Sequence, residues 1–385
     1  MTIAEKVADK IVSDHHMLVE TSLCSRFRTP KSDCSLCAEA CPANAITVSD
    51  GGAEITGGCI DCGVCHSACP NGAFGIRERS DERIMDEIPF SRRSPLRISC
   101  ERGDTSADII LPCLSRLTET LFLEPVRRGM PGIEIARPSC EGCLLVKAAF
   151  HLETVIRRTH HLYDMLGIAR NRLSIKNIPL QGLVKAPERA VSRREFFGVF
   201  RAKAAGIAAA AMPDIEGGGD GKAEVFRNAV EDRRESRKRS ILMERLLALG
   251  AKAGVKQTAA PSEDALTADI EVGAGCAACG VCASLCPTGA ISLQWTEKTF
   301  SLGFSPALCT NCRICEKTCR HRAITMKETV SPALLLQQGE TVLFRAEKKT
   351  CLACRLDFIG EGAEICPLCR DRNKKQTAVL QELFK

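Results

Sequence analysis

Cysteine is the residue type in this chain with the clearest potential for chemistry. The chain holds 24 cysteines, and they lie in tight groups rather than scattered along loops. Two runs share the spacing C-x2-C-x2-C-x3-C followed by proline: Cys59, Cys62, Cys65, Cys69 and Pro70, and Cys276, Cys279, Cys282, Cys286 and Pro287. A two-residue gap curls the backbone so that successive thiolates face one centre, whereas the three-residue gap and the proline direct the fourth thiolate to a neighbouring centre. This spacing is typical of iron–sulfur ligands; zinc, the alternative at paired cysteines, rarely shows it.

Each of these runs has a partner in the sequence. Near the C-terminus the partner is Cys309, Cys312, Cys315 and Cys319, with Arg320 in the place of the proline. Near the N-terminus it is Cys24, Cys34, Cys37 and Cys41, in which nine residues separate the first two cysteines. The tails after the fourth cysteines are also alike, because they read CPANAI, CPNGAF, CPTGAI and CRHRAI.

These two stretches resemble the bacterial ferredoxins that hold two [4Fe–4S] clusters each. The resemblance implies four clusters in all. It implies a first ligand set of Cys24, Cys34, Cys37 and Cys69 and a second of Cys41, Cys59, Cys62 and Cys65. It implies a third set of Cys276, Cys279, Cys282 and Cys319 and a fourth of Cys286, Cys309, Cys312 and Cys315. The long loop after Cys24 leaves two outcomes open: four protein ligands if the loop closes, and three if it does not.

Four more cysteines lie in a central segment, and they follow predicted strands. The strands are expected at 97–99, 108–111 and 132–136, with helices at 115–128 and up to residue 159. Parallel strands bring their carboxyl ends to one edge of a sheet, which would gather Cys100, Cys113, Cys140 and Cys143. We interpret this as a further iron–sulfur site, and we expect a [2Fe–2S] cluster there. Zinc, a redox-active dithiol at Cys140 and Cys143, and inert buried thiols are the alternatives.

The last four cysteines form a compact pattern near the end of the chain. Cys351, Cys354, Cys366 and Cys369 resemble the two knuckles of a zinc ribbon, and rubredoxin-type iron is the alternative. A module this small has little apolar core, so its folding would depend on the metal.

The stretch between residues 181 and 265 has no cysteine and is predicted to be helix and linker. Residues 213–222 are rich in glycine and are expected to be flexible. Residues 224–249 have helical periodicity, and their basic run 233–239 is expected to be a solvated helix face rather than a binding site. The stretch Ser192–Phe197 resembles a twin-arginine export signal, but its position in mid-chain favours an amphipathic helix.

The sequence therefore predicts an α+β multidomain protein of 385 residues. The predicted domains are a dicluster ferredoxin domain (1–90), a central α/β domain (91–180), a helical linker (181–265), a second dicluster domain (266–345) and a zinc-ribbon-like tail (346–385). The formal net charge of +6 comes without a basic stripe with interleaved aromatics, so nucleic acid is not an expected partner. Residues 1–14 do not resemble a signal peptide, and no apolar run reaches the roughly 20 residues of a membrane span.

We expect a cytoplasmic electron-transfer subunit that carries four [4Fe–4S] clusters, a possible further cluster in the central domain and Zn²⁺ in the tail. Its expected partners are other oxidoreductase subunits or a soluble redox donor or acceptor. No acid, base or nucleophile constellation is evident. The alternative is a redox enzyme in which the central cysteines carry out thiol–disulfide or cluster-based chemistry.

Overall fold

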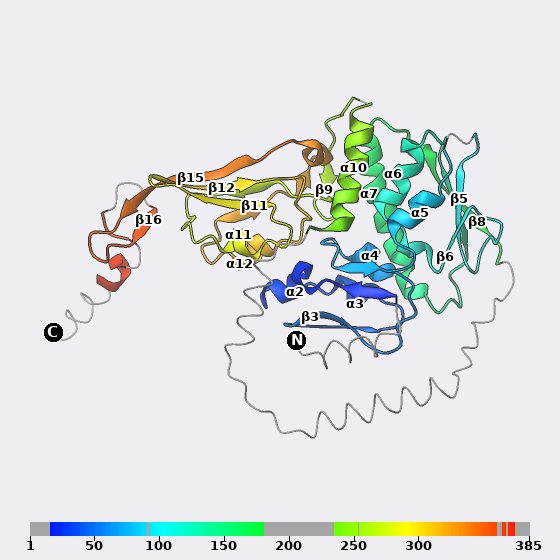
Figure 1. Ribbon diagram of the computed structural model, residues 1–385, viewed down its shortest axis with the longest axis horizontal. Coiled ribbons are helices and arrows are strands. Elements are labelled where there is room, and N and C mark those ends of the chain that lie inside the picture. Colours follow the sequence, from blue (N-terminus) through cyan, green and yellow to red (C-terminus); the bar gives the residue numbers. More distant parts are fainter. Residues whose placement is uncertain are drawn as a thin grey trace, which may run out of the picture.

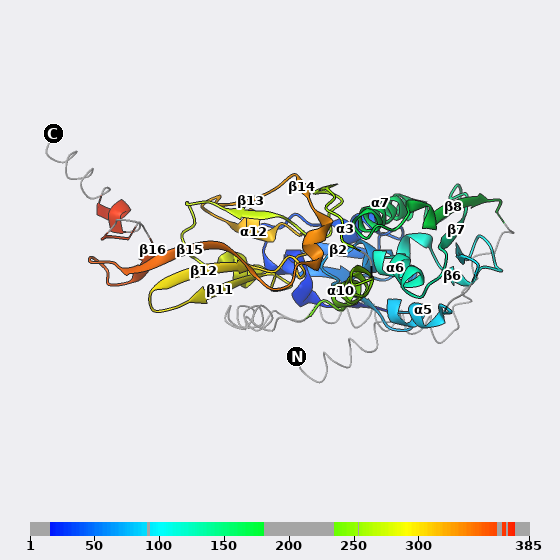
Figure 2. The ribbon, with the colours of Figure 1, turned by 90° about the horizontal axis from the view of Figure 1, so that it is seen from above.

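The computed structural model describes residues 16–90, 93–180, 235–252, 254–359, 364–366 and 369–373. The glycine-rich stretch 213–222 and the twin-arginine-like stretch 192–197 lie outside these residues. The molecule is elongated: an α/β part lies at one end, the C-terminal tail at the other, and two cysteine-rich units lie between them (Figures 1 and 2). Within the described ranges, no helix has the length and apolar character needed to cross a membrane.

The N-terminal unit is built from two antiparallel strand pairs around short helices. Strand β1 (Met17–Val19) pairs with β4 (Phe74–Ile76), and β2 (Ile46–Ser49) pairs with β3 (Gly52–Ile55). The helices are η1 (Thr21–Leu23), α2 (Ser25–Arg28), α3 (Leu36–Ala40) and α4 (Val64–Ala68). Helices this short are not stable on their own. They are held by a small core in which cysteines pack beside alanine, isoleucine and phenylalanine side chains.

The C-terminal unit repeats the order strand, helix, hairpin, helix, strand. Strand β10 (Ile270–Val272) pairs antiparallel with β13 (Ile324–Met326), and β11 (Ile291–Trp295) forms a hairpin with β12 (Thr299–Phe304). The helices are α11 (Val281–Leu285), α12 (Ile314–Thr318) and η5 (Pro332–Leu336). A short pair, β9 (Ala260–Pro261) and β14 (Thr329–Val330), closes the unit.

The central part is a parallel sheet of four strands in the order β6-β5-β7-β8. These are β5 (Leu96–Cys100), β6 (Ile109–Leu111), β7 (Ile133–Pro138) and β8 (Leu173–Ile178). Three of them were expected from the sequence, and β8 was not. The accompanying helices are α5 (Asp81–Glu87), η2 (Leu114–Arg116), α6 (Glu119–Arg127), η3 (Val146–Ala148), α7 (Ala149–Met165) and η4 (Arg170–Arg172).

Helix α10 (Arg237–Gly250) connects the central part to the C-terminal unit. Its apolar face is buried in the largest core of the molecule, which also contains side chains of α6, α7 and η5: Ile241, Leu242, Leu246, Leu249 and Leu335 all belong to it. The expectation that the basic run 233–239 forms a solvated face is therefore wrong for Lys238 and Arg239. Both lie against backbone carbonyls, because the helix packs between the two cysteine-rich units.

The tail continues a long edge of the C-terminal unit. Strand β15 (Thr341–Thr350) pairs with β12, and its far end pairs with β16 (Asp357–Ile359), so the four strands form one sheet in the order β11-β12-β15-β16. Figure 1 shows this strand extending from the body of the molecule to β16 in the C-terminal tail.

A buried histidine at the contact between α7 and α4 predicts a pH-dependent stability. The Ser67 hydroxyl donates to the Leu117 carbonyl, so it accepts from Nε2 of His151 at 3.0 Å. Burial, and then the positive charges of Lys238 and Arg158, lower the pKa of His151 to about 4. An unfolded histidine titrates near ~6.5, so the unfolded chain binds a proton between pH 6.5 and 4 that the folded chain does not. Stability is therefore lost as the pH falls through that range.

We expect the His151→Gln variant to lack this loss. Between pH 7.5 and 5.0, the difference in unfolding free energy between the native chain and His151→Gln should shrink by about 2 kcal/mol. Urea denaturation of the metal-loaded proteins at the two pH values measures this quantity. A difference that stays constant with pH would show that His151 is protonated alike in both states.

Candidate iron–sulfur centres

The cysteine loops share a backbone conformation that turns their thiols inward. In three C-x-x-C turns, the residue before the second cysteine and the residue after it both have positive φ. These pairs are Asp61 and Gly63, Ala278 and Gly280, and Asn311 and Arg313. Few residues other than glycine adopt this region. The turn is followed directly by α4, α11 or α12, whose first turn carries the third cysteine.

The first predicted set departs from this geometry, yet its members lie together. The turn between Cys34 and Cys37 has no residue with positive φ, since α3 already begins at Leu36. Instead η1 and α2 fold the long loop back, and Cys24 is buried. Burial raises the pKa of Cys37 to about 12, and three neighbouring sulfurs contribute to the rise: Cys69, Cys34 and Cys24. The loop after Cys24 therefore brings this cysteine near Cys34, Cys37 and Cys69, and its role as a fourth ligand stays a prediction.

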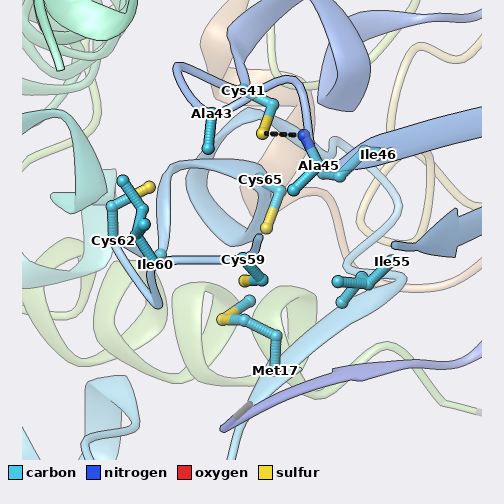
Figure 3. Close-up of a pocket in the computed structure, with 11 residues that line it drawn as sticks. Met17, Cys41, Ala43, Ala45, Ile46, Ile55, Cys59, Ile60, Cys62 and Cys65 are labelled. Carbon is cyan, nitrogen blue, oxygen red and sulfur yellow. Dashed lines mark hydrogen bonds between the residues drawn. The ribbon is translucent and has the colours of Figure 1, made fainter. Parts of the chain in front are cut away.

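The second predicted set surrounds an apolar cavity in the N-terminal unit. Cys41, Cys59, Cys62 and Cys65 all line it, with alanine and isoleucine side chains and Met17 completing the wall. Figure 3 shows the sulfur atoms of Cys41, Cys59 and Cys65 turned toward this space, with Cys62 to one side. Cys41 comes from the first run and the other three from the second run, so the structure brings together the crossed set that the ferredoxin resemblance implies.

The C-terminal unit gathers its cysteines in the same crossed way. A matching apolar cavity is lined by Cys286, Cys309, Cys312 and Cys315. The third set lies nearby: burial raises the pKa of Cys276, and the sulfurs of Cys279 and Cys319 add to this rise. The pKa of Cys282 is also raised, first by burial and then by the sulfurs of Cys276 and Cys279. Each of the four predicted sets is thus gathered around its own centre.

Backbone N–H groups point at the sulfurs that cross between runs. The N–H four residues after the cysteine donates to Sγ at 3.3 Å in Cys41, 3.4 Å in Cys69 and 3.3 Å in Cys319; the donors are Ala45, Ala73 and Ala323. Such bonds stabilise a thiolate, whereas burial alone disfavours it. Four thiols, apolar walls and N–H donors to sulfur are the donor set that an iron–sulfur cluster requires, so the residues present fit that group.

The central cysteines meet at the carboxyl edge of the parallel sheet. Cys100 ends β5, Cys113 follows β6, and Cys140 and Cys143 follow β7. Burial raises the pKa of Cys100, and the sulfurs of the other three raise it further. The same edge contacts the N-terminal unit, where Cys113 packs near Cys62. Burial raises the pKa of Cys62 to about 12, and the nearby sulfur of Cys113 contributes to the rise. The buried side chains of Ala40, Val64 and Ala148 pack together at this contact.

The tail cysteines are held much closer together than those of the other sites. The sulfur atoms of Cys351, Cys354, Cys366 and Cys369 all lie within 4.8 Å of one another, the one such group of His, Cys, Asp or Glu among the described residues. Cys354 and Cys366 have their sulfurs 3.8 Å apart. A tetrahedral ion with metal–sulfur bonds of about 2.3 Å separates its ligands by roughly this distance. The tail can therefore hold a single metal ion rather than a cluster of four irons.

The two cysteine-rich units touch through residues that the sequence did not single out. The Thr310 hydroxyl, next to Cys309, donates to Oδ1 of Asn71 at 2.5 Å, and Asn71 lies in the loop after Cys69. Both residues are buried. Lys317 also pairs with Asp33, beside Cys34. Nothing in the local sequence predicts these contacts, because the paired residues lie 239 and 284 positions apart.

The fold is mixed α/β and includes a ferredoxin-like dicluster domain. Residues 32–74 match the family of 4Fe-4S dicluster domains. The matched range contains the seven cysteines from Cys34 to Cys69 and stops short of Cys24. No curated protein has a sequence that matches this chain. Iron–sulfur electron transfer is the function that the domain match and the cysteine sites support.

Proposed function

We propose that this chain is an electron-transfer protein that carries four [4Fe–4S] clusters and serves as a subunit of a larger oxidoreductase complex. When bound, a [4Fe–4S] cluster accepts and returns one electron at low potential. The observation that carries the proposal is the pair of apolar cavities lined by crossed cysteines, one in each unit. In crossed ligation, one short loop supplies thiols to two neighbouring sites, which keeps those sites close together.

Contacts between the ligand loops support a single series of sites. The third and fourth sets share the loops around α11 and α12, and the fourth set meets the first through Thr310 and Asn71. The first and second sets share the loops around α3 and α4. The second set adjoins the central cysteines through Cys62 and Cys113. The proposed order is therefore third, fourth, first, second and central, with the direct contact between units in the middle.

The exposure of the cysteines favours the third set as the place where a partner meets the chain. Cys279 of that set is exposed, whereas the other 23 cysteines are buried or half-buried. We propose that a redox partner approaches the third site beside Cys279, because electron transfer between proteins requires a short distance.

Metal analysis of the anaerobically purified chain, together with redox-titrated EPR, tests this proposal. Four clusters correspond to about 16 iron atoms per chain, and a further [2Fe–2S] centre at Cys100, Cys113, Cys140 and Cys143 raises the count to about 18. The signals are expected to be reduced reversibly at low potential. A count near four iron atoms, with zinc as the dominant metal, would overturn the proposal.

For the tail we propose a structural Zn²⁺ held by Cys351, Cys354, Cys366 and Cys369. The Cys366 N–H donates to Sγ of Cys351 at 3.2 Å, and this bond, with the N–H groups of Cys354 and Ala353, lowers the pKa of Cys351. We expect about one zinc per chain, and none in the Cys366→Ser variant. The iron count and the EPR spectrum should not change in that variant. Iron in place of zinc, recognisable by its visible absorption, would contradict the assignment.

A further inference from the structure

Two neighbouring cations at the start of α10 hold the two cysteine-rich units together. Nζ of Lys238 donates to the carbonyls of His66, Ser67 and Cys69 at 2.9, 2.6 and 3.0 Å. These carbonyls lie at the carboxyl end of α4, where a helix leaves its acceptors unpaired and a cation is favoured. Lys238 therefore binds the loop that contains Cys69, a predicted ligand of the first set.

Arg239, the next residue, binds backbone carbonyls of the C-terminal unit. Its guanidinium donates from Nε to the Ala307 carbonyl at 2.6 Å, from Nη1 to that of Leu266 at 2.9 Å and from Nη2 to that of Pro306 at 3.2 Å. Arg239 is 6% exposed. The carbonyls of Pro306 and Ala307 lead directly into Cys309, a ligand of the fourth set. One helical turn thus binds the ligand loops of two different sites.

Neither cation forms a direct ion pair with a carboxylate of the described residues. Among the described residues, no aspartate or glutamate oxygen lies within 4.0 Å of Lys238 or Arg239, although other basic residues of the same region have such partners. A buried positive charge is costly unless negative charge lies near it. The nearby groups that can supply it are carboxylates and the sulfurs of the two ligand loops. Lys238 interacts favourably with Glu119, Cys69 and Asp81, and Arg239 interacts favourably with Cys309 and Glu119.

The backbone is shaped for this close approach. Gly72, in the loop after Cys69, has φ +72°, and a Cβ there would lie 2.6 Å from the Ser236 hydroxyl oxygen and 3.1 Å from Cβ of Lys238. Beside it, Asn71 accepts the hydrogen bond from Thr310. The cations and this bond together fix the Cys69 loop against the Cys309 loop.

We propose that Lys238 and Arg239 join the first and fourth cluster sites, each supplying the positive charge that stabilises the reduced cluster on its own side. The inference rests on the proposed function, because it assigns a role to these residues only if the sites hold clusters. A cation close to a cluster favours the more negative, reduced form, so its removal makes the facing cluster harder to reduce. Lys238 acts on the first site and Arg239 on the fourth.

Redox titrations of the full, metal-loaded chain followed by EPR test this assignment. The variants are Lys238→Gln and Arg239→Gln, which remove the charge and leave a neutral amide donor in its place. Signals are assigned to the first and fourth sites with Cys34→Ser and Cys312→Ser. We expect Lys238→Gln to change the oxidised-to-reduced ratio of the first site by about tenfold at a fixed potential, which is a downward shift of about 59 mV for one electron. Arg239→Gln should do the same to the fourth site alone.

Two matched variants separate charge from structure. Lys238→Arg keeps the charge and should leave the first site close to its native potential. Arg237→Gln removes the adjacent charge, which is exposed and paired with Glu82, and should shift neither site. Selective loss of iron from the facing site would also support the proposal. Unchanged potentials, or equal changes and equal iron loss at all sites, would overturn it, whereas a native chain without iron would refute the proposed function itself.

Discussion

Serine in place of Cys41 is expected to remove the same iron atoms as serine in place of Cys59, although Cys37 lies much closer to Cys41 in the sequence. Cys41 and Cys59 line one cavity, together with Cys62 and Cys65, because the three-residue gap after Cys37 turns Cys41 away from the first set. Each substitution should lower the iron content by about four atoms per chain, the content of one [4Fe–4S] cluster. Iron and sulfide analysis with EPR measures the loss.

The double variant makes this test sharper. If both residues bind one cluster, Cys41→Ser combined with Cys59→Ser loses no more iron than either single variant. Cys37→Ser is the matched control, since it should abolish a different EPR signal and add its loss to that of Cys59→Ser. If Cys41→Ser instead abolished the signal that Cys37→Ser abolishes, the ligation would follow the order of the sequence and the crossed assignment would be wrong.

Replacing Glu124 by glutamine should lower the unfolding free energy by about 3–5 kcal/mol, the usual cost of breaking a buried ion pair from one side. Its side chain is fully buried, and its carboxylate accepts from Arg127 at 2.6 Å and from Arg128 at 2.5 Å. On the other side it meets Arg245 of α10 at 2.7 Å. The loss leaves three partly buried guanidinium groups without their shared counter-charge and loosens α10 from α6.

Urea denaturation at neutral pH measures the effect of Glu124→Gln. Although burial opposes ionisation, hydrogen bonds from Arg127 and Arg128 lower the pKa of Glu124. The ionised carboxylate therefore stabilises the fold at pH values above its unfolded pKa, and this stabilisation is lost as the pH falls through the folded pKa. Glu153→Gln is the control, because Glu153 is half exposed where it pairs with Arg137 and should cost no more than about 1 kcal/mol. Equal costs for the two variants would show that the Glu124 pair is not held in the folded core.

Short stretches of sequence were enough to predict the parts that depend on local chain geometry. The spacing of Cys59, Cys62 and Cys65 predicts the inward turn, and the structure shows the turn with positive φ at Asp61 and Gly63. The alternation of apolar strands and helices predicts the parallel pairing of β5, β6 and β7, which places the central cysteines at one edge. Strand β8 was missed, although residues 173–176 alternate between apolar and polar side chains, because it lies beyond the last cysteine.

The sequence by itself determined which cysteines form each local loop, since a gap of two or three residues leaves the backbone few ways to turn. Tertiary structure alone decided how the loops meet. Lys238 and Cys69 lie 169 residues apart in the sequence, and Asn71 and Thr310 lie 239 residues apart. No local sequence pattern relates positions so far apart. A basic run is usually solvated. Here Lys238 and Arg239 form a junction instead, because α10 is packed between two units whose backbone carbonyls accept hydrogen bonds from them.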